Sequence, residues 1–193
     1  MENGVQKRRD GSTLWRSRDG REWEKISIIS NERCATETAF DFLQDERIVA
    51  FVRHDCEDCS AELKTAVPPY SDWTTFYRFP FRYQGPCLKR IGNTVVLSGR
   101  VMFEDEATPL LTPDIRDRQR GLLIMTVDVD EGRVVPAYML PHDTGTVKID
   151  GRDAFPDISY AGIVDPGSGK FTMSYYEGYK IRKSWVRMAV FNM

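Results

Sequence analysis

Hydrophobic and polar residues alternate in short runs along nearly the whole chain, and this period of two predicts β-strands. Each run is bounded by Gly, Pro, Asn or Asp, which favour turns. No long window has the three- and four-residue hydrophobic spacing of an amphipathic helix, and the best patch, residues 113–120, is charged enough to predict a loop. We predict strands at residues 13–16, 23–29, 38–42, 48–53, 74–79, 88–91, 94–102, 122–128, 134–140, 160–164, 170–176 and 185–191.

About a dozen short strands in one chain predict an all-β fold, which leaves a sandwich, a barrel or a propeller as candidates. A length of 193 residues suits one domain with a substantial core. Residues 1–11 precede the first strand and are expected to form a disordered leader.

Residues 157–177 form the stretch with the most concentrated candidate chemistry. The predicted strands 160–164 and 170–176 flank Asp-Pro-Gly-Ser-Gly, which supplies the positive-φ residues of a hairpin loop. Three tyrosines and one glutamate lie within this hairpin. Aromatic residues are good strand formers, so composition alone leaves both a structural and a functional interpretation open.

Charge and hydropathy exclude two classes of partner. The formal net charge is -2 and the pI is about 5.8, with no basic block beyond Lys7, Arg8 and Arg9, so we expect no nucleic-acid binding. No apolar run approaches the roughly 20 residues that span a bilayer. The first ten residues lack the apolar core of a signal peptide, so a cytoplasmic location is the default expectation.

The four cysteines do not form a recognisable metal motif. Cys56 and Cys59 form a C-x-x-C pair beside His54, whereas Cys34 and Cys87 are isolated. A structural zinc site needs four converging ligands, normally from two such pairs. We therefore expect free thiols in a loop, ahead of a disulfide and then of zinc, and no cofactor. His142 is expected to be a loop residue.

Residues 17–23, Ser-Arg-Asp-Gly-Arg-Glu-Trp, resemble the Asp-box, or BNR repeat, of sialidase-type propellers. In that motif an Asp side chain accepts hydrogen bonds from backbone N–H groups, and a Gly takes the left-handed conformation. The Trp packs under the turn. An ordinary Asp-Gly hairpin is the alternative interpretation, and the motif marks a fold without carrying chemistry.

Further segments resemble bacterial sialidase (neuraminidase) proteins in the same order along the chain. The resemblance implies a sialidase-type six-bladed β-propeller, of which this chain covers about three blades. Residues 1–193 would then be a single incomplete propeller domain, the C-terminal half. The segments are residues 37–40, 48–53, 68–73, 85–88, 97–100, 157–162 and 174–176.

The same resemblance implies a retaining glycosidase site. Tyr160 would be the nucleophile and Glu37 its base, because a neutral phenol is not repelled by a sugar carboxylate. Arg53 and Arg100 would bind that carboxylate through their planar guanidinium groups and lower the pKa of Tyr160. Tyr176 would line the pocket. A packed strand tyrosine, a solvated glutamate and surface arginine ion pairs are the structural alternatives.

The chain departs from the family because it has no counterpart of the family's first arginine and Asp general acid. The resemblance therefore implies a sialidase-like hydrolase of the exo-α-sialidase type that is inactive as this isolated chain. Its ligand would be a sialic-acid-like or other carboxylated glycan. The alternative is a non-catalytic module that binds carboxylated sugars or a partner protein. Uncovered blade edges predict self-association or a complementary N-terminal half.

Overall fold

The computed structural model describes an all-β chain, as the sequence pattern predicts. The described residues are 11–32, 34–55, 60–102, 120–141, 147–149, 152–154, 156–167, 170–179 and 183–192. Every strand pair is antiparallel, and hydrogen-bonded neighbours are always consecutive in the sequence. Among these residues, no helix is long and apolar enough to cross a membrane.

The first two sheets contain six strands. One sheet pairs two strands, and the next contains four strands in sequence order. The strands are β1 (Ser12–Arg16), β2 (Glu24–Ser30), β3 (Ala35–Phe42), β4 (Ile48–His54), β5 (Glu62–Ala66) and β6 (Thr74–Arg78).

The later strands form a second four-stranded sheet, a small two-stranded sheet and a three-stranded sheet. The four-stranded sheet contains β7 (Tyr83–Ile91), β8 (Thr94–Met102), β9 (Arg120–Asp128) and β10 (Arg133–Pro141). The other two contain β11 (Val147–Ile149) with β12 (Arg152–Ala154), and β13 (Pro156–Val164), β14 (Lys170–Tyr179) and β15 (Lys183–Asn192).

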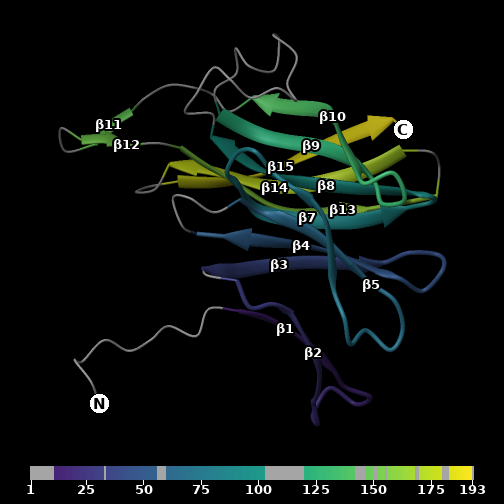
Figure 1. The fold of residues 1–193 in the computed structure, drawn as a ribbon. Helices are drawn as coiled ribbons and strands as arrows, with labels where there is room; N and C mark the ends of the chain where they lie inside the picture. The colour runs from purple at the N-terminus through teal and green to yellow at the C-terminus, as the bar shows by residue number, and fades with distance from the viewer. Residues whose placement is uncertain are drawn as a thin grey trace, which may run out of the picture.

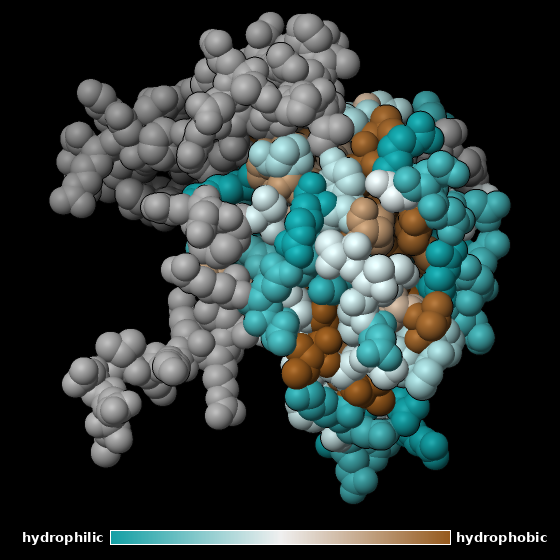
Figure 2. All heavy atoms as spheres, viewed as in Figure 1, coloured by the Kyte–Doolittle hydropathy of each residue, from teal (hydrophilic) through white to brown (hydrophobic). Residues whose placement is uncertain are grey.

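The larger sheets follow one another in space in the order of the sequence, with β3 and β13 both beside β7. Figure 1 shows β1 and β2 at the lower end of the molecule, below β3–β6 and β7–β10. Three apolar clusters fill the spaces between these sheets. Figure 2 shows hydrophobic residues as separate patches among hydrophilic ones on this face of the molecule. The large apolar contacts of the described chain are therefore the buried clusters between the sheets.

The largest cluster lies between β3–β6 and β7–β10 and is rich in aromatic rings. Phe79 stacks on Tyr83 with ring centroids 5.3 Å apart, and Phe51 meets both rings edge-on. The buried Tyr83 hydroxyl donates to the Leu123 carbonyl oxygen at 2.6 Å, which joins β7 to β9. This hydrogen bond lets a polar aromatic residue occupy an otherwise apolar core.

All twelve predicted strands are present with some shifted ends, whereas β5 and the short strands β11 and β12 were not predicted. The sequence pattern missed β5 because Glu62 and Lys64 suggest a solvent-facing strand, whereas both are buried. β13 begins at Pro156, four residues before the predicted start. The predicted leader lies outside the described residues except for Gly11, and Cys56, Cys59 and His142 also lie outside them. Cys87 is a free cysteine.

The turn at residues 17–23 adopts most of its expected geometry. The Asp19 carboxylate accepts hydrogen bonds from the backbone N–H groups of Arg21 and Glu22 at 2.8 and 3.0 Å. Gly20 has a φ of 74°, as a left-handed turn position requires. Trp23 does not pack beneath the turn: its side chain is exposed, and its indole N–H donates to the Gly20 carbonyl oxygen.

Glu62 on β5 is fully buried and joins three elements through its carboxylate. Ser30 and Thr75 donate hydrogen bonds to it at 3.0 and 2.8 Å, and Lys64 lies 3.5 Å away. Burial raises the pKa of Glu62, but hydrogen bonds from His54 and Thr75 outweigh burial and lower the pKa to about 2. The ionised form is therefore the one that the folded chain stabilises.

Glu62→Gln should lower the free energy of unfolding at pH 7 by about 3 kcal/mol, because it leaves buried cationic partners without their counter-charge. Since the folded-state pKa is below the unfolded value, the contribution of Glu62 is present above about pH 4.5 and disappears as the pH falls toward 2. Urea unfolding between pH 7 and 3 would measure both effects. Glu22→Gln, at an exposed turn, is the control, and an equal loss in both variants would contradict the assignment.

Candidate active site

Five side chains that the sequence singled out gather where three sheets meet. Glu37 lies near the start of β3, and Arg53 is at the end of the antiparallel neighbour β4. Arg100 lies near the end of β8, while Tyr160 and Tyr176 come from the paired strands β13 and β14. The alternating connections bring these strand ends to one side of the molecule, so residues up to 139 positions apart can form one site.

Tyr160 and Glu37 are in direct contact. The Tyr160 hydroxyl donates a short hydrogen bond to Glu37 Oε1 across 123 positions of sequence. The side chain of Tyr160 remains accessible, since the residue is 53% exposed. A phenol with an acceptor carboxylate and a solvent-facing ring is the arrangement expected of a nucleophile beside its base.

Glu37 is held from two other directions. Arg53 Nη1 lies 2.9 Å from Glu37 Oε2, and the Gly85 backbone N–H donates to the same oxygen at 3.2 Å. Arg53 is itself oriented by Asp55, whose Oδ1 lies 2.6 Å from the arginine Nε. The carboxylate is therefore fixed relative to Tyr160 before any ligand binds.

Arg100 occupies the neighbouring position. One of its Nη atoms pairs closely with the Asp157 carboxylate, and the other donates to Gln84 Oε1 at 2.8 Å. Arg100 is also near enough to favour ionisation of both Tyr160 and Tyr176. The two arginines thus flank the tyrosines, but each is already paired with carboxylates of this chain.

Tyr176 forms the second aromatic surface of the site. Its ring stacks on that of Tyr160 with centroids 5.9 Å apart and an interplanar angle of 16°. The two rings give a partly exposed aromatic surface bordered by charged groups. The neighbouring Tyr175 points to the other face of β14, where it is partly buried against the core cluster.

A β-bulge directs Tyr160 into this position. The register between β13 and β14 shifts between Ser159 and Gly162, and Tyr160 has a φ of 48°. This left-handed conformation is unfavourable for a tyrosine and must be maintained by its surroundings. The Ser159 hydroxyl donates to the Gly85 carbonyl oxygen at 2.8 Å, which ties the bulge to β7.

The protonation states follow from these contacts. Burial raises the pKa of Glu37, but hydrogen bonds from Tyr160 and Arg53 outweigh it and hold the pKa below its ordinary value. The hydrogen bond to Glu37 raises the pKa of Tyr160, with burial as a second cause, and the two arginines do not compensate. The expected lowering of the Tyr160 pKa is therefore wrong, because the direct contact with one carboxylate outweighs two more distant cations.

Sequence reasoning missed the groups that orient the five side chains. Asp55, Gln84, Gly85 and Asp157 each contact one of them, and Ser159 contacts Gly85. Gly85, Asp157 and Ser159 fall within segments that the resemblance had marked. A pattern along one strand cannot show which polar side chain meets a partner from another sheet.

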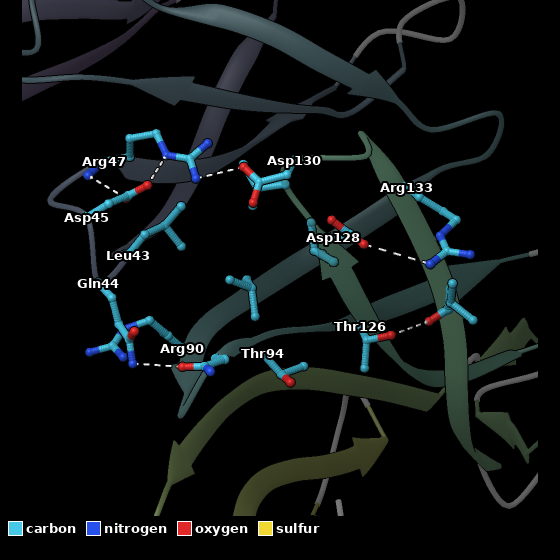
Figure 3. A pocket seen from close by; sticks show the side chains of 15 residues that line it. Leu43, Gln44, Asp45, Arg47, Arg90, Thr94, Thr126, Asp128, Asp130 and Arg133 are labelled. Carbon is cyan, nitrogen blue, oxygen red and sulfur yellow. Dashed lines mark hydrogen bonds and ion pairs between the residues drawn. The ribbon is translucent and has the colours of Figure 1, made fainter.

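A separate hollow of the described chain contains none of these residues. It has a volume of about 520 Å³ and is lined by the β3–β4, β7–β8 and β9–β10 connections, at the opposite ends of the strands. Figure 3 shows Arg47 between Asp45 and Asp130, each 2.7 Å away, and Arg133 beside Asp128. We favour the tyrosine site because it contains a phenol in direct contact with a carboxylate, and no such pair is found among the residues that line this hollow.

One described cluster has the geometry of a metal site. Ligand atoms of Glu32, His54 and Glu62 lie within 4.8 Å of one another. However, Arg78 lies 2.6 Å from Glu32 and 3.3 Å from Glu62, and Lys64 adds a second positive charge. These cations supply the counter-charge that a metal ion would otherwise provide.

Comparison with solved structures identifies the fold as that of β-propeller glycoside hydrolases. A protein of unknown function from Dyadobacter fermentans matches 94% of this chain with a TM-score of 0.66 and 16% identity. An α-L-arabinofuranosidase from Fusarium graminearum, in complex with an iminosugar inhibitor, matches 92% with a TM-score of 0.60 and 10% identity. An α-L-arabinanase from Penicillium chrysogenum, complexed with arabinobiose, matches 82% with a TM-score of 0.55 and 13% identity.

This chain spans 45%, 54% and 46% of the lengths of those three proteins. No protein-family model matches the sequence, and neither does any curated protein sequence. The predicted membership of the sialidase superfamily is therefore wrong: no family match supports it, and the two hydrolases above are an α-L-arabinofuranosidase and an α-L-arabinanase. The all-β propeller prediction is confirmed, whereas the six-bladed sialidase type is not.

Glu37→Gln should lower the pKa of Tyr160, because it removes the carboxylate that opposes phenolate formation. Arg53→Ala should raise the pKa of Tyr160 above its value in the parent chain, because it removes a positive charge that favours the phenolate. Ultraviolet titration of the phenolate band would measure both shifts, with Tyr160→Phe subtracted to isolate this ring. Glu22→Gln is the control, and an unchanged Tyr160 titration in Glu37→Gln would show that the contact is absent in solution.

Gly85→Ala should lower the free energy of unfolding by about 2–4 kcal/mol, because a Cβ at residue 85 would overlap the Ser159 side chain and its backbone has a φ of 56°. Gly20→Ala is the matched control: its φ is 74° but no atom lies within 4 Å, so it should cost only about 1 kcal/mol. Urea unfolding compares the variants. Adding Ser159→Gly to Gly85→Ala should restore part of the lost free energy of unfolding. If it restores none, the overlap with Ser159 is not the cause of the destabilisation.

Proposed function

We propose that this chain binds a glycoside and cleaves it through Tyr160, with Glu37 as the base. The observation that carries the proposal is the hydrogen bond from the Tyr160 hydroxyl to a carboxylate already fixed by Arg53 and Gly85. A nucleophile, a base and a group that orients the base are the elements required for covalent catalysis. The matched hydrolases support a carbohydrate as substrate.

The protonation states suit this chemistry. At neutral pH Tyr160 keeps its proton and Glu37 is ionised, since their pKa values are raised and lowered respectively. As the phenolic oxygen attacks the anomeric carbon, Glu37 accepts the proton and the leaving group departs with the bonding electrons. Glu37 then passes that proton to the departing oxygen or to solvent. Water attacks the anomeric carbon, Glu37 accepts a proton from it and returns that proton to the Tyr160 oxygen as the glycosyl–tyrosine bond breaks, so the configuration is retained.

The charges around Tyr160 favour a neutral sugar. Glu37, Asp55 and Asp157 contribute three carboxylates against the two guanidinium groups of Arg53 and Arg100, and both arginines are committed to these acids. A carboxylated sugar would add a further negative charge to this site. It is the second candidate because the Arg100 Nε is buried without a hydrogen-bond partner.

The leaving group is expected to limit the reaction. The remaining carboxylates near Tyr160, Asp55 and Asp157, are each ion-paired with an arginine and are poorly placed to donate a proton. Loss of general acid catalysis typically lowers the rate by roughly 10²–10⁴-fold. Glycosides with good leaving groups do not need that proton, so they provide the sensitive test.

The purified chain should release dinitrophenolate from dinitrophenyl α-L-arabinofuranoside at least about 100-fold faster than it cleaves arabinobiose. A 2-fluoro glycosyl fluoride of the same sugar should label the peptide that contains Tyr160, as measured by mass spectrometry. Tyr160→Phe should abolish labelling, and Glu37→Gln should slow it by roughly 10²–10⁴-fold. Tyr175→Phe is the matched control.

Labelling at another residue, or unchanged release by Tyr160→Phe, would overturn the catalytic assignment. Binding of arabinobiose without release from any aryl glycoside would leave a non-catalytic carbohydrate-binding module, the alternative that the sequence also allowed. A dinitrophenyl glucuronide run in parallel tests the charge argument. A higher rate on that substrate would show that Arg53 and Arg100 exchange their internal partners for a substrate carboxylate.

A further inference from the structure

The outer face of the β13–β15 sheet is apolar and uncovered. Along β15, Ala189 and Phe191 pack into the core, whereas the alternate residues Val186, Met188 and Val190 are 77%, 73% and 64% exposed. A strand whose two faces are both apolar normally lies between two layers. In the described chain, the outer face of β15 has no such second layer.

The apolar surface continues across the sheet. Antiparallel pairing places Val190 opposite Thr172, which is opposite Val164, so these three side chains lie on one face. Met188 is likewise opposite Ser174, which is opposite Gly162. These two rows contain no charged residue, and Val164 is 64% exposed. The result is a smooth surface suited to packing against another sheet.

The other end of the molecule has a second uncovered face. β1 and β2 cover β3–β6 through the cluster that includes Leu14 and Ile29. Their opposite face presents Trp15 and Ile28, which are half exposed. The two four-stranded sheets in between each pack against a neighbour on both sides, so the two unmatched faces lie at the two ends of the series.

We propose that the outer face of β13–β15 binds the outer face of β1–β2 in a second copy of this chain, and that the reciprocal contact closes a two-fold ring. Two observations favour a second copy over another partner. Among the described residues, the two uncovered faces lie at opposite ends of one series of sheets, so a second copy offers the face of the opposite end to each of them. One symmetric pairing also covers both exposed faces at once.

The interface adjoins the candidate active site. Tyr176 is opposite Val186 in the β14–β15 register, so it lies on the same face and carries the Tyr160 ring stacked on it. A second copy on this face would therefore cover one side of the tyrosine pair. The association itself rests on the uncovered faces and is independent of any hydrolytic activity.

Sedimentation of the full chain should show a dimer. Val190→Glu should raise the apparent dissociation constant at least about 100-fold, because it buries an unpaired charge. Val67→Glu makes the same substitution at an exposed residue of the β5–β6 connection, which belongs to neither sheet of the proposed contact, and it should leave the dimer unchanged. Circular dichroism melting of each variant checks that the monomer remains folded.

The orientation of the contact has its own test. Trp15→Glu should also give a monomer, and mixing it with Val190→Glu should restore part of the dimer, because the mixed pair keeps one intact interface. A monomeric parent chain at about 100 µM would overturn the proposal, since a stable interface of this kind should assemble there. A dimer that Val190→Glu disrupts and Trp15→Glu leaves intact would overturn the head-to-tail contact, and open polymers would overturn the closed ring.

Discussion

The position of the Glu37 carboxylate is the constraint on which the candidate site depends. It belongs to β3, yet it accepts a hydrogen bond from Gly85 at the start of β7 and another from Tyr160 on β13. Arg53, from the neighbouring strand β4, neutralises it within its own sheet. One carboxylate therefore fixes the relative positions of three sheets at one side of the molecule, while the apolar clusters determine their separation elsewhere.

The sequence predicted the fold class because its signal is local. Alternation of hydrophobic residues and turn residues between the runs determines which segments are strands, whatever lies across the sheet. β5 was missed because the same local signal assigns Glu62 and Lys64 to solvent. Their burial depends on partners from other strands, Ser30 on β2 and Thr75 on β6, which no pattern along β5 contains.

The five site residues were named from a resemblance and do come together, but the superfamily behind that resemblance is wrong. The chemistry of the side chains explains both outcomes. Tyr160, Glu37 and Arg53 form a connected polar group, and the charge of Arg100 acts on Tyr160 from beside it. The charge available to a ligand depends on Asp55 and Asp157, which neutralise the arginines and whose contacts appear only in three dimensions.

The order of the strands has a consequence for how the molecule folds. Each sheet contains only consecutive antiparallel strands, so it can form from neighbouring segments as they leave the ribosome. Glu37, by contrast, meets Tyr160 only after 123 further residues have been made. Until β13 docks, the partners available to its carboxylate are solvent, Arg53 and Gly85. The Glu37–Tyr160 contact of the candidate site would then be among the last contacts that the nascent chain forms. An early, nearly folded species would contain its first sheets but not yet this pair of side chains.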